Sequence, residues 1–94
     1  MAEGRQARRI YVSGQVQGVG YRYFACHAAE EIRVGGYVKN LPDGRVEVYA
    51  IGTRAQLDSL VAVLRRGPRH ALVEEVSLED ADLLPEFGPY FTIE

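Results

Sequence analysis

The sequence predicts an α+β domain in which two helices cover one face of an antiparallel sheet of four to five strands. Three observations lead to this prediction. The chain has 94 residues, enough for one core between two layers. Its apolar residues alternate with a strand period in some segments and recur with a helical period in others. These segments follow one another in the order βαββαβ, and a further short strand closes the chain.

The first strand is expected over residues 8–14, where Ile10 and Val12 point to the same face. A helix is expected from residue 21, because small and apolar residues then recur every three or four positions. This stripe consists of Tyr21, Ala25, Ala28 and Ile32. The pair Gly35-Gly36 is expected to end the helix.

A hairpin is expected in the middle of the chain. A short strand over residues 37–41 leads into Pro42-Asp43-Gly44, and the Asp-Gly pair is typical of tight turns between strands. The strand after the turn alternates, so one face carries apolar residues. These are Val46, Val48 and Ala50.

The second helix has clear boundary signals. Thr53 and Gln56 have the spacing of a capping box, and Gly67-Pro68 stops the helix. Four residues between these signals form one apolar face: Leu57, Leu60, Val61 and Leu64.

The remaining segments predict two more strands. Residues 73–78 are expected to form a strand with Val76 and Leu78 pointing inward. Phe91 and Ile93 are expected to close the chain with a short strand. The domain is therefore expected over residues 8–94, after a flexible tail of residues 1–7.

The simplest packing of this order is a ferredoxin-like sandwich, a split βαβ pair with both helices on one face. In that topology strands 1 and 2 run parallel with strand 3 between them, so their carboxyl ends share one edge of the sheet. The segment after Ile10-Tyr11-Val12 and the residue Asn40 would then lie about 10 Å apart, two strand spacings.

Composition excludes several functional classes. The net charge is −2, with 13 acidic and 11 basic residues, so the chain as a whole does not suit a nucleic-acid surface. The single cysteine, Cys26, excludes an internal disulfide and fits a reducing cytoplasm. No segment has the apolar length of a membrane span or a signal peptide. No cluster of residues has metal-ligand spacing, and no long apolar stretch requires a partner. We therefore expect a cytoplasmic monomer without a metal or other cofactor.

The segment from Gly14 to Arg22 carries the strongest functional signal. It is a glycine-rich turn between a strand and a helix. Such a turn presents free backbone N–H groups at the positive end of the helix dipole, where an anion binds well. An arginine in the first helical turn adds a guanidinium group that fits two oxygens of a phosphoryl group. The segment therefore predicts an anion site.

Two segments resemble the signature motifs of the acylphosphatase family. The first is Val16-Gln17-Gly18-Val19-Gly20-Tyr21-Arg22, and the second runs from Gly36 to Glu47 and contains Asn40 and Asp43-Gly44. Residues 67–73 and the final Phe91-Thr92-Ile93 are similar to later landmarks of the family. The resemblance begins near residue 8 and covers almost all of the chain.

The resemblance implies an enzyme that hydrolyses small acyl phosphates to a carboxylate and inorganic phosphate. It implies that Arg22 binds phosphate as a catalytic residue and that Asn40 positions the attacking water. The substrate-binding residues it implies are Gln17, Gly18, Val19, Gly20, Tyr21 and Arg22. A carboxylate with a pKa near 4 leaves without a proton, so this chemistry needs no general acid.

Other phosphate chemistries fit the residues less well. The loop has no Gly-Lys-Ser/Thr, which a Walker loop requires. A cysteine phosphatase needs its thiolate before the arginine, whereas Cys26 follows Arg22. These comparisons favour direct attack by water.

Two non-enzymatic alternatives remain open. The same βαββαβ order occurs in RNA-binding domains, where strand 3 carries basic and aromatic residues; here the outward positions of that strand include Glu47. The second alternative is a domain that binds phosphate or another anion without turning it over. Such a domain would serve as an anion sensor or as an accessory domain in carbamoyl transfer.

Overall fold

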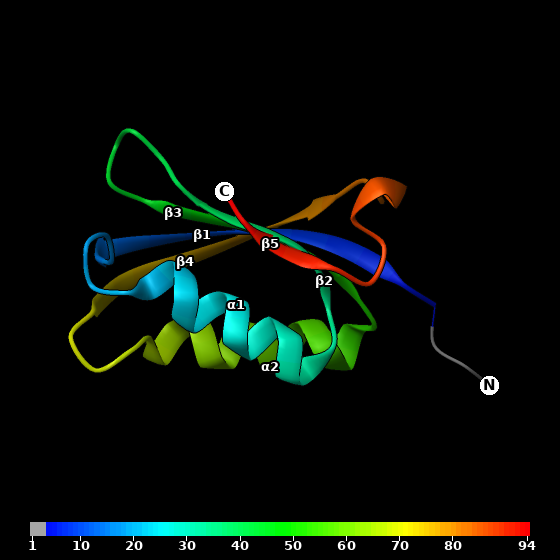
Figure 1. Ribbon diagram of the computed structural model, residues 1–94, viewed down its shortest axis with the longest axis horizontal. Coiled ribbons are helices and arrows are strands. Elements are labelled where there is room, and N and C mark those ends of the chain that lie inside the picture. The colour runs from blue at the N-terminus through cyan, green and yellow to red at the C-terminus, as the bar shows by residue number, and fades with distance from the viewer. Residues whose placement is uncertain (1–3) are drawn as a thin grey trace.

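Five strands form one sheet in the order β4–β1–β3–β2–β5, and both helices lie on the same face of it (Figure 1). The computed structural model describes residues 4–94. Its elements are β1 (Gln6–Gln15), α1 (Tyr21–Ile32), β2 (Gly35–Asn40), β3 (Val46–Gly52), α2 (Arg54–Arg66), β4 (Leu72–Ala81), the 3₁₀ turn η1 (Pro85–Phe87) and β5 (Phe91–Ile93). The predicted ferredoxin-like α+β sandwich is confirmed.

The topology brings the carboxyl ends of β1 and β2 together, as the sequence predicted. Both strands pair antiparallel with β3, which lies between them, so β1 and β2 run in the same direction. The added strand β5 is the exception to an antiparallel sheet, because it pairs parallel with β2. It reaches this position through the connection from β4, which passes over the sheet with η1 in it (Figure 1).

Several predicted boundaries differ from the structure. β2 spans Gly35–Asn40 where residues 37–41 were expected, and β4 spans Leu72–Ala81 where residues 73–78 were expected. β1 begins at Gln6, so the last part of the expected 1–7 tail is strand; residues 1–3 lie outside the described part of the chain. Helix α1 ends before Gly35-Gly36. Arg33 closes it in the left-handed region, with φ of 71° and its N–H donated to the Ala29 carbonyl. Gly35 instead belongs to β2, where a Cβ atom would lie 2.1 Å from the Gly88 carbonyl oxygen.

The hairpin and the second helix follow their sequence signals. The Gly44 N–H donates to the Leu41 carbonyl in the β2–β3 turn. At α2, the Thr53 hydroxyl accepts from the Gln56 N–H, and the Gln56 side chain accepts from the Thr53 N–H, which completes the capping box. Arg65 and Arg66 lie in the last turn, where positive charge is favoured by the helix dipole.

The main core lies between the sheet and the two helices. The predicted inward residues of β1 and β3 and the four apolar residues of α2 are all buried in it. Leu78 is an exception, since 45% of it is exposed. It lies on the edge strand β4, and the core contacts only the first half of that strand, through Val73 and Val76.

A second, smaller cluster covers the opposite face of the sheet at one end. Tyr49 and Tyr37 stack there with ring centroids 5.5 Å apart, and Phe87 of η1 packs on both rings. Tyr49 is fully buried as a result. The two faces of β3 are therefore both covered, although its sequence alternates as in a strand with one free face.

Candidate active site

The loop between β1 and α1 has the backbone that an anion site requires. Gly18 and Gly20 have φ of 75° and 79°, in the left-handed region that glycine adopts without strain. Gly20 is the N-cap residue directly before α1, and it has no side chain to cap the helix. Free N–H groups of the first turn therefore remain available at the positive end of the helix dipole.

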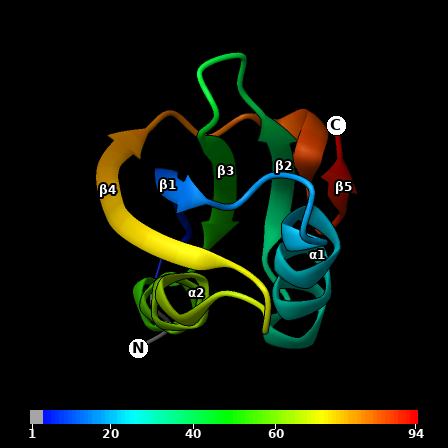
Figure 2. The ribbon, with the colours of Figure 1, turned by 90° about the vertical axis from the view of Figure 1, so that its left-hand side faces the viewer.

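The loop borders a hollow of about 140 Å³ at the end of the sheet where β1 and β2 finish. Figure 2 views this end, where the loop crosses from β1 to the start of α1 beneath the β2–β3 hairpin. The residues that line the hollow are Val16, Gly18, Gly20, Tyr21, Arg22, Tyr23 and Asn40. Arg22 and Asn40, far apart in the sequence, thus contribute to one cavity.

Arg22 is held at the edge of this hollow by the end of the chain. Its Nη1 donates to the Glu94 carbonyl oxygen at 3.0 Å, and the Glu94 N–H donates to the Val38 carbonyl at 2.8 Å. Strand β5 pairs with β2, so Glu94, which directly follows β5, lies near the site. This exposed hydrogen bond gives one end of the guanidinium a partner in the protein and orients it toward the site.

Asn40 has an unpaired oxygen. In residues 4–94, its Oδ1 is the buried side-chain atom that has no hydrogen-bond partner. A buried acceptor without a donor costs about 1–3 kcal/mol, so such atoms are rare unless a ligand or water uses them. Asn40 is the last residue of β2 and lines the hollow, which places this oxygen in position to accept from a bound molecule.

Two of the expected binding residues lie differently from the rest. Gln17 and Val19 do not line the hollow, whereas Gly18, Gly20, Tyr21 and Arg22 do. The Gln17 side chain instead turns to the β2–β3 hairpin, where Nε2 donates to the carbonyls of Leu41 and Arg45, each at 2.9 Å. No pattern in the sequence predicts this contact of the Gln17 side chain.

Two lining residues were not anticipated. Val16 is buried, and Tyr23 is 76% exposed at the hollow. The position of Tyr23, directly after Arg22, is the signal that sequence reasoning could have used.

The Cys26 thiol is a poor nucleophile in this setting. Burial and the nearby Glu30 carboxylate both raise the pKa of Cys26, which keeps it protonated. Its Sγ lies 3.9 Å from the Phe91 carbonyl, on the side of α1 that packs against β5. Cys26 is also not among the residues that line the hollow.

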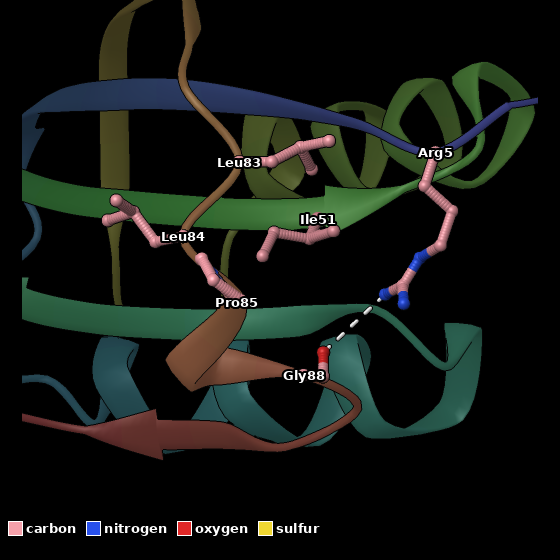
Figure 3. A pocket seen from close by; sticks show the side chains of 6 residues that line it. All are labelled: Arg5, Ile51, Leu83, Leu84, Pro85 and Gly88. Carbon is pink, nitrogen blue, oxygen red and sulfur yellow. Dashed lines mark hydrogen bonds between the residues drawn. The ribbon is translucent and has the colours of Figure 1, made fainter.

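A larger hollow of about 390 Å³ lies elsewhere, between Arg5 and the chain around η1 (Figure 3). Its lining is mainly apolar, from Ile51, Leu83 and Leu84. The Arg5 guanidinium points to the Gly88 carbonyl at 3.5 Å. None of the residues expected to bind phosphate lies there. The smaller hollow is therefore the candidate active site, because it has the anion-binding groups and the unpaired oxygen.

A ferredoxin-like sandwich with an uncapped helix start, an arginine and an asparagine at one sheet edge defines a phosphoryl-binding domain. Comparison with known proteins names the family. The acylphosphatase family model matches residues 8–93. The chain therefore belongs to the acylphosphatase family, and it is an enzyme of that type, as the two motifs implied.

Individual relatives agree with the family match. The acylphosphatase of Archaeoglobus fulgidus is 49% identical over 77 residues, which are 82% of this chain and 86% of the relative. That of Koribacter versatilis is 48% identical over 81 residues, 86% of this chain and 74% of the relative. The crystal structure of acylphosphatase from Bacillus subtilis superposes with a TM-score of 0.86 at 38% identity, covering 94% of this chain and 97% of that one.

The RNA-binding alternative is not favoured. RNA-binding sheets of this topology stack bases on exposed aromatic residues. Here Tyr49, on the face away from the helices, is covered by Phe87, and its hydroxyl donates to the Asp82 carbonyl at 2.6 Å. In the described residues, no helix is long and apolar enough to cross a membrane.

Proposed function

We propose that the small hollow hydrolyses acyl phosphates, with Arg22 and the 17–22 loop holding the phosphoryl group and Asn40 holding the attacking water. The observation that supports this most directly is the shared cavity. Arg22, the loop glycines and the unpaired Asn40 Oδ1 border the same 140 Å³ of space. About 10–15 Å³ already admits one water, so this volume has room for a phosphoryl group with a water beside it.

The loop and Arg22 bind the three phosphoryl oxygens in this proposal. Charge gathers on these oxygens in a loose transition state. Backbone N–H groups at the start of α1 meet that charge in fixed geometry and do not reorganise during the reaction. The Nη1 of Arg22 is already bonded to Glu94, so its remaining guanidinium N–H groups serve the phosphoryl group.

Asn40 orients the water and removes no proton. Its Oδ1 accepts one O–H of the water, which leaves a lone pair to point at phosphorus. An amide is too weak a base to take the proton, so the phosphoryl oxygens receive it. The P–O bond to the acyl group breaks as the water oxygen bonds to phosphorus. The carboxylate departs as an anion and requires no acid at its pKa near 4.

The acyl group has no room inside the hollow and extends outside it in this proposal. Tyr23 is exposed beside the opening and offers an aromatic surface there. The proposed substrates are therefore small acyl phosphates in which the phosphoryl group provides most of the recognition.

The proposal is tested by hydrolysis of benzoyl phosphate in excess EDTA. We expect turnover well above background, because the proposed steps use no metal ion. Arg22→Lys keeps the charge but loses the planar fork, so it should lower kcat/KM at least 100-fold and weaken inhibition by inorganic phosphate. Arg65→Lys, at an exposed position of α2, is the matched control. A folded wild-type protein without turnover would refute the proposal.

We further propose that the protein works as a monomer in the cytoplasm. The single Cys26 with its raised pKa fits a reducing compartment, where it needs no partner thiol. Gel filtration with light scattering measures the mass directly, and a particle of twice the 10.5 kDa chain mass would contradict the monomer.

A further inference from the structure

Gln17 connects the two halves of the candidate site. Its Nε2 donates one hydrogen bond to the Leu41 carbonyl and another to the Arg45 carbonyl, both at 2.9 Å. Gln17 lies in the loop that borders the hollow, and Leu41 directly follows Asn40 in the chain. The two bonds therefore span from the β1–α1 loop to the base of the β2–β3 hairpin.

We propose that Gln17 is a positioning residue that sets the distance between the phosphoryl-binding loop and Asn40. The inference rests on the proposed function, since it concerns the same two groups. It assigns to the Gln17 side chain a role separate from that of the loop backbone.

The geometry favours Gln17 for this role because its two bonds join the loop itself to the hairpin, whereas β1 and β2 are linked through β3. β1 and β2 do not pair with each other; each pairs with β3. The register of β3 fixes where the strands end, and Tyr21 holds the α1 end of the loop to the core, whereas Gln17 bonds the loop to the hairpin itself. A side chain that bonds across this gap holds the loop against the hairpin. In-line attack is sensitive to displacements of about 1 Å, which can cost about 100-fold in rate.

The acceptors of these bonds are themselves well ordered. The Arg45 carbonyl also accepts from the Leu41 N–H at 2.8 Å, and the Leu41 carbonyl accepts from the Gly44 N–H at 3.1 Å. Each carbonyl has two lone pairs, so the two N–H groups of the Gln17 amide use the second one of each. The hairpin turn thus supplies fixed points for the loop.

Gln17 is exposed, which separates its effect on the rate from its effect on folding. Hydrogen bonds at an exposed site add little to the free energy of folding, because water replaces them when they break. Loss of the two bonds should therefore leave the protein folded and let the loop drift relative to Asn40. The phosphoryl group would still bind, since the loop glycines and Arg22 are unchanged.

The test is Gln17→Met, which keeps the length of the side chain and removes its donors. We expect kcat for benzoyl phosphate to fall at least tenfold, while the inhibition constant of inorganic phosphate stays within threefold of wild type. Gln56→Met is the matched control. Gln56 also bonds backbone groups, Thr53 and Ile32, but it does so at the start of α2. That variant should lose thermal stability and keep its kcat.

Three outcomes would overturn the inference. A kcat for Gln17→Met within tenfold of wild type would show that the bonds do not position the site. An inhibition constant that rises by the same factor as kcat falls would mean that Gln17 forms the phosphate cradle itself. If Gln56→Met lost as much kcat as Gln17→Met, the loss in Gln17→Met would be explained by reduced stability. Asn40→Ala separates this inference from the proposed function. If Asn40→Ala keeps the wild-type rate, the proposed role of Asn40 in holding water is wrong. If Asn40→Ala loses rate and Gln17→Met does not, only the inference about Gln17 is overturned.

Discussion

The Tyr21 hydroxyl donates a 2.8 Å hydrogen bond to the Leu64 carbonyl, near the end of α2. In a continuing helix that carbonyl would accept from the N–H of residue 68, but residue 68 is a proline and has none. Tyr21 therefore supplies the missing donor. Its ring is buried at the start of α1, so the same side chain also fastens the β1–α1 loop to the core.

Tyr21→Phe should lower the free energy of unfolding by about 1–3 kcal/mol, since the Leu64 carbonyl would stay buried without a donor. Urea unfolding monitored by circular dichroism measures this change. Tyr23→Phe removes the same hydroxyl from an exposed ring and should change stability by less than about 0.5 kcal/mol. Equal stability of wild type and Tyr21→Phe would contradict the structural role of the bond.

Asn40→Ala should reduce kcat at least 100-fold while the inhibition constant of inorganic phosphate changes little. The substitution removes the oxygen proposed to hold water and leaves Arg22 and the loop in place. It also removes a buried acceptor without a partner, so we expect stability to be retained or slightly increased. Steady-state kinetics and a thermal melt together test both points. A large loss of stability would show that Asn40 is paired in the resting protein.

Tyr23→Ala should raise KM for benzoyl phosphate about two- to tenfold, which corresponds to about 0.5–1.5 kcal/mol of aromatic contact. KM for acetyl phosphate should be unaffected, because its methyl group gains little from a ring. Tyr90→Ala, at another exposed tyrosine, is the control and should alter neither constant. The same change in KM for both substrates would show that Tyr23 does not distinguish between acyl groups.

Stability should decrease between pH 10 and pH 12. Burial, together with the 2.5 Å hydrogen bond to Glu47, raises the pKa of Tyr37 to about 12. The unfolded chain releases the same proton near pH 10. Over this range the unfolded state binds fewer protons than the native state, so rising pH favours unfolding, by about 1–3 kcal/mol in total. Burial also raises the pKa of Tyr21, which acts with the same sign.

Urea unfolding at pH 7, 9, 10 and 11 measures this decrease. Tyr37→Phe should be less stable than wild type at pH 7, because the buried Glu47 loses the hydrogen bond from Tyr37, while its ion pair with Lys39 at 3.7 Å remains. Its stability should then fall less steeply above pH 10. Parallel curves for the two proteins would show that Tyr37 does not cause the alkaline loss.

Local signals predicted most of the elements. The family resemblance of the two motifs pointed to five of the residues that line the hollow, but not to Val16 and Tyr23. The Thr53–Gln56 capping box and the Asp43-Gly44 turn depend on residues within a few positions of each other, and both formed as expected. The predicted end of α1 and the role of Gly35-Gly36 were wrong. Arg33 ends α1 ahead of the glycines, and Gly35 serves a close approach to Gly88, more than fifty residues away.

The sequence by itself determined the order of elements, the family and the proximity of the β1–α1 loop to Asn40, because periodicity, turn chemistry and two motifs are local properties. The tertiary structure alone decided the parallel addition of β5 and the cover over Tyr49. It also decided the unpaired oxygen of Asn40 and the reach of Gln17 to the hairpin. These features depend on the free energy of packing and of hydrogen bonds between segments far apart in the chain, which no local pattern encodes.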